Sequence, residues 1–348
     1  MVMPEGLQSP GARLLMARPW ELLLNDAACK PKPRKFADPD WTADGEKRAR
    51  VALSDFRTLW INTGTLCNIE CINCYIESSP ANDRLAYITA QETARFYEEI
   101  AGSNLPIPEI GFTGGEPFMN PDMLTMAGDA LQRGFAVLIL TNAMQPMQRP
   151  RISTGLLALR DTYRERLTLR VSLDHYSELL HEAERGKGTF APTLKGIDWL
   201  GWAGFKFTLA GRTCWGESEA DARAGYAALS AARSWGLDAH DETQLILFPE
   251  MDERADVPEI TEACWGILGK RPDDIMCASS RMVVKRKGAS TPTVLPCTLL
   301  PYDRAFEMGT TLAQAVNADG GMFDAGAVKL CHQHCAKFCV LGGGSCST

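Results

Sequence analysis

Residues 59–75 read Leu-Trp-Ile-Asn-Thr-Gly-Thr-Leu-Cys-Asn-Ile-Glu-Cys-Ile-Asn-Cys-Tyr. An apolar, strand-like run leads into a loop that carries Cys67, Cys71 and Cys74. Spacings of three and two intervening residues let one loop wrap a metal–sulfur cube and give thiolates to three of its irons. The fourth iron is then left without a protein ligand, as a reactive metal site requires. A structural zinc site instead takes a closed set of four ligands, and this loop supplies only three cysteines.

Downstream of this loop, apolar strand-like runs alternate with helix-like segments. After the run at 59–61, the expected strands span 109–113, 136–142, 168–173, 205–210 and 244–248. Near-continuous apolar runs of this kind are typical of a parallel sheet buried on both faces. Helix boundaries are predicted by a capping box at Thr89 and Glu92 and by Asn120-Pro121 before the next helix. Six strand–helix units predict an α/β fold, an open (β/α)6 barrel over residues 51–255.

Two flanking regions differ from this pattern. Residues 1–50 contain closely spaced prolines and basic residues, which predict an extended N-terminal arm or a partly disordered tail. Residues 256–348 are rich in cysteine and glycine and have few helix signals, which predicts a small, loop-rich domain held by metal.

Composition limits the classes of function. The 348 residues are 45% hydrophobic and 23% charged, as in an ordinary globular protein, and the net charge of −7 argues against a general nucleic-acid binder. No run approaches the roughly 20 apolar residues that cross a membrane, and the apolar patch at 14–17 ends at Arg18-Pro19, unlike a signal peptide. We therefore expect a cytoplasmic protein without nucleic-acid or membrane partners. In that reducing compartment, 12 cysteines, most of them in two groups, indicate metal binding rather than disulfides.

The first cysteine group, with the aromatic Tyr75 directly after it, resembles the signature of the radical S-adenosylmethionine (SAM) superfamily. The resemblance implies that Cys67, Cys71 and Cys74 form the catalytic centre. They would hold a [4Fe-4S] cluster whose open iron chelates the amino and carboxylate groups of SAM. It also implies that Tyr75 packs near the adenine. Structural cysteines or a zinc site are the alternatives.

The ends of the next two strands carry motifs that support this resemblance, because barrel enzymes place their chemistry at the carboxyl ends of strands. The strand at 109–113 runs into Thr113-Gly114-Gly115-Glu116-Pro117, where adjacent glycines permit close backbone approach. In the family this turn meets the amino group of SAM, whereas taken alone it is a tight turn. The following strand ends in Thr141-Asn142, which lies near the adenosine in the family, although Ala143 replaces the usual glycine.

The fourth strand ends in Ser172-Leu173-Asp174, and alternation along a strand puts Ser172 and Asp174 on one face. The family often uses the serine to contact SAM. His181 and the segment from Arg185 to Phe190 resemble a pattern common in radical SAM proteins with a SPASM-type extension, with His175 in place of its usual glycine. Arg185 fits a cofactor contact and a surface salt bridge equally well.

The C-terminal cysteines resemble a SPASM domain or its shorter twitch form, which binds auxiliary clusters. The candidate ligands are Cys277, Cys297, Cys331, Cys335, Cys339 and Cys346. Their spacing departs from the usual pattern, and six thiolates cannot complete two fully thiolate-ligated clusters. We therefore expect at least one auxiliary [4Fe-4S] cluster, with any second one incomplete or using His332 or His334. A zinc knuckle is the alternative.

The resemblance, which covers about residues 57–348, implies a radical SAM oxidoreductase. An external donor of flavodoxin or ferredoxin type would reduce the first cluster, and reductive cleavage of SAM would give a 5′-deoxyadenosyl radical that abstracts hydrogen from substrate. The auxiliary cluster would accept an electron or bind substrate.

The substrate stays open. It is a peptide or protein, as for maturases of ribosomal peptides, or a small molecule such as a sugar or tetrapyrrole; residues 1–50 show no peptide-recognition domain, which favours a compact substrate. A non-catalytic iron–sulfur or zinc scaffold is the alternative from another class. A third reading is methyl transfer from SAM with Cys214 or Cys264 as acceptor.

Overall fold

An eight-stranded sheet organises residues 34–103, 105–249 and 256–343, which are the residues that the computed structural model describes. The first part of the expected N-terminal arm and Cys346 lie outside them. Six strands run parallel, side by side in chain order, and closely match the runs expected from the sequence. They are β2 (Thr58–Asn62), β3 (Glu109–Thr113), β4 (Ala136–Thr141), β5 (Leu167–Ser172), β6 (Lys206–Arg212) and β7 (Leu245–Phe248).

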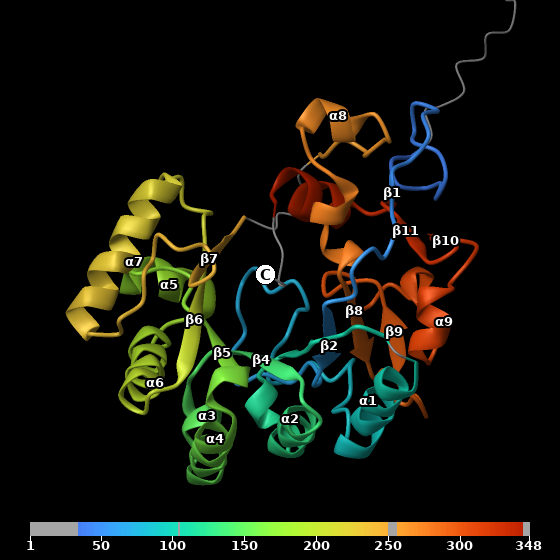
Figure 1. Ribbon diagram of the computed structural model, residues 1–348. Helices are drawn as coiled ribbons and strands as arrows, with labels where there is room; N and C mark the ends of the chain where they lie inside the picture. The colour runs from blue at the N-terminus through green and yellow to red at the C-terminus, as the bar shows by residue number, and fades with distance from the viewer. Residues whose placement is uncertain (1–33, 104, 250–255, 344–348) are drawn as a thin grey trace, which may run out of the picture. The chain divides into compact units, whose positions relative to one another are not determined.

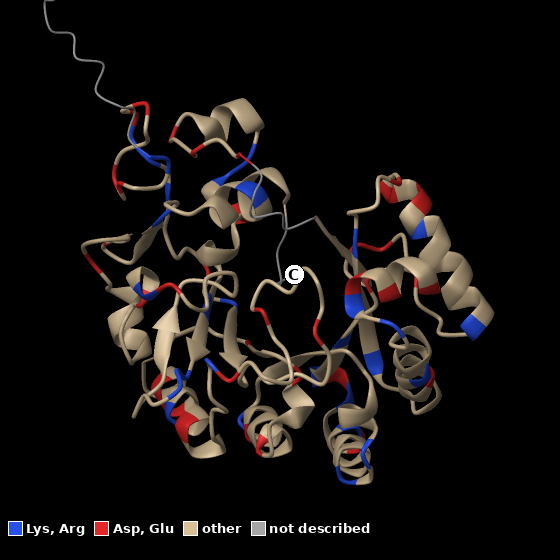
Figure 2. Cartoon of the chain, turned by 180° about the vertical axis from the view of Figure 1, so that it is seen from behind, with Lys and Arg blue, Asp and Glu red and all other residues tan. Residues whose placement is uncertain are grey.

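Helices cover the outer face of this sheet (Figure 1). The longer ones are α1 (Ala90–Ser103), α2 (Met123–Gln132), α4 (Pro150–Tyr163), α6 (Phe190–Trp202) and α7 (Glu219–Arg233). Two short helices, α3 (Gln145–Gln148) and α5 (Glu178–Arg185), precede α4 and α6. The alternation of strand and helix confirms the α/β barrel expected from the sequence. Both acidic and basic residues lie on the outer helices in the view of Figure 2.

Strands from the C-terminal region extend the same sheet. β8 (Ser280–Val284) pairs in parallel with β2, and β9 (Thr293–Leu295) pairs antiparallel with β8, so the strand order is β7-β6-β5-β4-β3-β2-β8-β9. β2 and β8 are buried along their whole length, as central strands of a parallel sheet require. A boundary at residue 255 between barrel and auxiliary domain stays a prediction.

A second, three-stranded sheet joins residues from both flanking regions. Its order is β1-β11-β10, formed by β1 (Arg50–Val51), β10 (Phe323–Asp324) and β11 (Ala327–Lys329). Next to it, Arg48 is buried and pairs with Glu259 at 2.6 Å. The described end of the expected arm is therefore packed against the C-terminal region. That region also contains α8 (Cys264–Leu268), α9 (Leu312–Val316) and a π-helix, Cys335–Leu341.

Helix ends follow the sequence signals with one difference. The capping box before α1 is present, with Glu92 N donating to Thr89 Oγ1 and Thr89 N donating to the Glu92 carboxylate. α2 begins at Met123, later than Asn120-Pro121 suggested. The Asn120 side-chain amide donates to the carbonyls of Thr63 and Ile88 and so joins separate loops. Its Oδ1 accepts from Asp122 N at 2.9 Å, so Asn120 also caps the turn that leads into α2.

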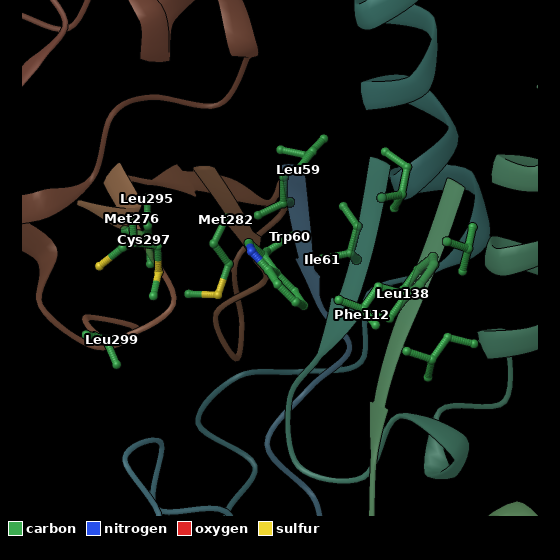
Figure 3. Close-up of a cluster of buried hydrophobic side chains, with 14 of the residues drawn as sticks. Leu59, Trp60, Ile61, Phe112, Leu138, Met276, Met282, Leu295, Cys297 and Leu299 are labelled. Atoms are coloured by element: carbon green, nitrogen blue, oxygen red, sulfur yellow. The ribbon is translucent and has the colours of Figure 1, made fainter. Parts of the chain in front are cut away.

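The hydrophobic core is continuous from the barrel strands into the C-terminal region. Figure 3 shows Phe112 and Leu138 on the barrel side, Trp60 and Met282 in the middle, and Cys297 near the far end. In the part of the chain that the structure describes, no helix is both long and apolar enough to cross a membrane.

Candidate functional site

The three cysteines that follow β2 open onto one pocket. Cys67 is buried, and Cys71 and Cys74 are half-buried. The pocket encloses about 1090 Å³ of empty space, its open mouth included, at the carboxyl ends of the barrel strands. Of the residues expected to bind the cofactor, it is lined by Tyr75, Thr113, Gly114, Gly115, Asn142, Ser172, Asp174 and Arg185. The sequence motifs that are far apart along the chain therefore meet around a single cavity.

Glu184 of α5 holds the cysteine loop in place. Its carboxylate accepts hydrogen bonds from the backbone N–H of Asn73 at 2.9 Å and from the Asn73 side chain at 2.8 Å. Its carbonyl accepts from Ile72 N at 2.9 Å. From the end of β6, Arg212 donates to the carbonyl oxygen of Asn73 at 3.1 Å. Sequence analysis missed both Glu184 and Arg212, because nothing in the sequence ties them to this loop.

The Gly-Gly turn after β3 packs directly on the segment that enters the cysteine loop. Gly115 N donates to Gly64 O at 2.8 Å, and a Cβ added at Gly115 would lie 2.1 Å from Leu66 O. Gly114 has φ of +139°, which favours glycine. The sequence predicted that the glycines allow close backbone approach. In the structure they allow the turn to pack against the backbone that enters the cysteine loop, and the turn also forms part of the pocket wall.

Glu116, in contrast to the glycines before it, is not among the residues that line the pocket. Its buried carboxylate accepts hydrogen bonds from Thr141 Oγ1, from Asn142 N at 2.9 Å and from Phe118 N at 3.1 Å. It therefore ties the turn after β3 to the end of β4. Burial raises the pKa of Glu116 to about 7, although the bonds to Asn142, Phe118 and Thr141 act in the opposite direction.

Asn142 is held on both sides of its amide. Its Nδ2 donates to Asn68 Oδ1 at 2.9 Å, which links the end of β4 to the cysteine loop, and its Oδ1 accepts from Met144 N. Ala143 takes a left-handed conformation with φ of +57°, so alanine adopts here the geometry that the usual glycine provides. Such a conformation costs an L-residue about 1–2 kcal/mol.

Asp174 and Arg185 form a buried ion pair in the pocket wall. Arg185 Nε and Nη2 donate to the two carboxylate oxygens at 2.8 and 3.0 Å. Burial alone would raise the pKa of Asp174, but Arg185 and Arg212 outweigh it and lower that pKa. The sequence allowed two roles for Arg185, a cofactor contact or a surface salt bridge. In the structure Arg185 forms a salt bridge that is buried and lies in the pocket wall.

The other residues that the sequence singled out lie away from the pocket. His181 is fully buried against Phe190, at a ring-centroid distance of 5.4 Å, and does not line the pocket. His175 Nε2 is bonded to Glu217 at 2.5 Å, and Cys214 is half-buried outside the lining.

Burial makes two thiols of the cysteine loop poor acids. It raises the pKa of Cys67 to about 12 and that of Cys71 to about 11, Arg185 opposing the shift at Cys71. Thiolates at these positions therefore need a metal to displace the proton. Within the described residues, no three Cys, His, Asp or Glu side chains converge to bind a single metal ion.

Four C-terminal cysteines line a second, smaller cavity with mainly apolar walls. They are Cys277, Cys297, Cys335 and Cys339, and His334 joins them. Their number and kind fit a fully thiolate-ligated cluster. Cys331 is not among the lining residues, and its thiol lies 3.4 and 3.3 Å from the carbonyl oxygens of Phe36 and Asp38.

The two cavities share a wall. Leu299 lines both of them, and Phe338 of the first is followed directly by Cys339 of the second. The C-terminal region also touches the cysteine loop through Tyr302, whose hydroxyl donates to Ile76 O at 2.6 Å.

Comparison with known proteins agrees with this arrangement. Residues 61–221 match the family model described as "Radical SAM superfamily". Over 135 residues the chain is 30% identical to AlbA, the antilisterial bacteriocin subtilosin biosynthesis protein of Bacillus subtilis (38% of this chain, 28% of the relative). Over 147 residues it is 32% identical to the AdoMet-dependent heme synthase of Methanosarcina barkeri (41% and 38%). The matched segments thus span well under half of either relative.

A solved structure shares the fold. SuiB of Streptococcus suis bound to S-adenosylmethionine aligns with a TM-score of 0.53 at 13% identity, covering 77% of this chain and 67% of that chain.

Proposed function

Because residues 61–221 match the radical SAM superfamily model, we propose that this protein is a SAM-cleaving oxidoreductase whose catalytic centre is formed by Cys67, Cys71 and Cys74. The observation that carries the proposal is the single pocket lined by these cysteines and by the Gly-Gly turn, Asn142 and Asp174. When bound, a [4Fe-4S] cluster with SAM supplies reductive cleavage to methionine and a 5′-deoxyadenosyl radical that takes hydrogen from the substrate.

In this proposal the cysteine loop gives one thiolate to each of three irons and leaves the fourth for the amino and carboxylate groups of SAM. Glu184 and Arg212 fix the loop, so the thiolates are held in place before the cofactor binds. The Gly-Gly turn and Ser172 border the same space and are placed to meet the polar groups of SAM. Tyr75, whose hydroxyl oxygen lies 3.5 Å from Thr113 Oγ1, would pack near the adenine.

The roles of Asp174, Arg185 and Glu116 follow from their partners. Asp174 orients Arg185, and together they offer SAM a rigid donor–acceptor pair. Glu116 acts as a positioning residue, because it reaches the pocket only through Thr141 and Asn142.

The rest of the pocket lining indicates the chemical class of the substrate. Phe248 and Phe338 stack at a centroid distance of 5.8 Å, with Pro249 and Leu299 beside them in the lining. On the polar side, in addition to Arg185 and Asp174, which face SAM in this proposal, the lining has Arg170 and Arg212. This balance favours a substrate with an apolar or aromatic part and an anionic group. Peptides and compact carboxylated molecules both fit this description, as do the bacteriocin and heme named for the two curated relatives.

We further propose that Cys277, Cys297, Cys335 and Cys339 ligate one auxiliary [4Fe-4S] cluster, and that Cys331 does not take part. Because Leu299 lines both cavities, this cluster would lie beside the substrate side of the first pocket. An electron left on the substrate then has a short route to the auxiliary centre. A donor of flavodoxin or ferredoxin type would supply the electron that starts the reaction.

The test is formation of 5′-deoxyadenosine by anaerobically reconstituted protein with dithionite and SAM. The wild type should form it, Cys71→Ala should not, and Cys214→Ala, outside the pocket, should resemble the wild type. Fully iron-loaded wild type that forms none would favour a non-catalytic scaffold. Methylation of Cys214 or Cys264 in mass spectra would favour methyl transfer.

A further inference from the structure

Arg281 is a cation buried within the sheet, in the strand β8. It lies in β8 beside Leu59 of β2, and none of its surface is exposed. Its Nη1 donates to the carbonyl oxygens of Cys277 at 2.6 Å and Ser280 at 2.8 Å, and its Nη2 donates to Gly326 O at 3.3 Å. Nε is buried and has no hydrogen-bond partner. Among the described residues, no Asp or Glu forms an ion pair with Arg281.

A buried guanidinium without a counter-ion is unusual because moving a charge out of water costs several kcal/mol. Carbonyl oxygens satisfy its N–H groups but carry no net charge. Arg48, of which 1% is exposed, follows the usual rule. It has Glu259 at 2.6 Å in addition to its carbonyl partners. Arg281 therefore lacks an anion that Arg48 has.

An anion that pairs with Arg281 would lie in the adjacent cavity, which is lined by four cysteines. The carbonyl that Arg281 binds most closely is that of Cys277, whose thiol lines the four-cysteine cavity. Cys277 is among the four cysteines that we assign to the auxiliary cluster.

We propose that Arg281 is the counter-ion of the auxiliary metal–thiolate centre and raises its reduction potential, an inference that rests on the proposed auxiliary cluster. Four thiolates outweigh the positive charge of a [4Fe-4S] core, so the ligated cluster is an anion. One-electron reduction makes it more negative by one charge. A fixed cation in a medium of low dielectric constant stabilises the reduced form more than the oxidised form.

The experiment uses the full-length Cys67→Ala/Cys71→Ala/Cys74→Ala variant, which retains only the auxiliary centre. Its cluster is titrated with dithionite against redox mediators, and the reduced form is followed by electron paramagnetic resonance. Arg281→Met removes the charge, Arg281→Lys keeps it, and Arg271→Met is the control at an exposed arginine.

In Arg281→Met, the ratio of reduced to oxidised cluster at a fixed potential should fall about tenfold, which equals about 59 mV for a one-electron couple. Arg281→Lys and Arg271→Met should stay close to the parent. Loss of iron from Arg281→Met, with iron and potential both kept in Arg281→Lys, would also support a role for the charge.

Two results would overturn the inference alone: an unchanged potential in Arg281→Met, or loss of the cluster from both Arg281 variants, which would show that the guanidinium acts through its geometry and not its charge. Zinc in place of iron in the parent variant would overturn the auxiliary cluster and this inference together.

Discussion

Glu116 gives the sharpest test of how the pocket is built. Burial raises the pKa of its carboxyl from an ordinary 4.5 to about 7. Each pKa unit corresponds to about 1.4 kcal/mol, so ionising Glu116 costs roughly 3 kcal/mol more in the folded chain than in the unfolded chain. The folded state therefore holds this proton more tightly. The contribution of Glu116 to stability is fully present below about pH 4.5 and is lost as the pH rises through about 7.

Glu116→Gln removes the titrating proton and keeps the side chain's size. Other carboxyl groups titrate alike in both proteins, so they cancel in the comparison. Between about pH 5 and about pH 8, the free energy of unfolding of the variant should rise by roughly 3 kcal/mol relative to the wild type. The assay is anaerobic urea unfolding of both proteins in the same cluster state, with the exposed Glu165→Gln as control. A difference that stays flat over this range would refute the account of Glu116 as a buried, neutralised link between β3 and β4.

Three further predictions concern the two cysteine sites. Glu184→Ala removes the carboxylate that holds the cysteine loop, and charged hydrogen bonds of this kind are worth about 1.5–3 kcal/mol. The iron that stays bound at the first site after gel filtration should therefore fall in this variant, whereas the control Glu178→Ala, at an exposed residue, should keep its iron. Gly115→Ala would place a Cβ 2.1 Å from the backbone oxygen of Leu66, at the entry to the cysteine loop. The affinity for SAM, measured by equilibrium dialysis, should drop at least about tenfold, which is a loss of about 1.4 kcal/mol. An unchanged affinity would show that the turn can shift to accommodate the Cβ without affecting SAM binding. Cys335→Ser should lose one cluster's worth of iron and sulfide and Cys331→Ser none, and equal losses would return Cys331 to the ligand set.

The sequence predicted the barrel well because its signals are local. Each strand from β2 to β7 is a short apolar run bounded by polar residues, and the capping box of α1 lies within four residues of chain. The motifs at the strand ends could be placed on one edge of the sheet by topology alone. The place of β8 beside β2 could not, because their pairing joins residues more than 200 positions apart, and the apolar run of β8 says nothing about its neighbour.

The parts of the site that the sequence missed depend on such distant contacts. In the sequence, Glu184 and Arg212 cannot be distinguished from ordinary surface charges. The fold of α5 and β6 brings them to the cysteine loop. Glu116 was expected to bind the cofactor, and its side chain instead joins two turns behind the pocket. The spacing of the C-terminal cysteines did not separate Cys331 from its neighbours, because that distinction comes from the carbonyls of Phe36 and Asp38.

The measurement closest to the central claim is electron–nuclear double resonance on the reduced protein with SAM labelled at the methionine nitrogen. The account predicts a coupling between that nucleus and the cluster spin, present in the wild type and absent in Cys71→Ala. It would be contradicted by a reduced cluster that shows no coupling to bound SAM, or by zinc on Cys67, Cys71 and Cys74.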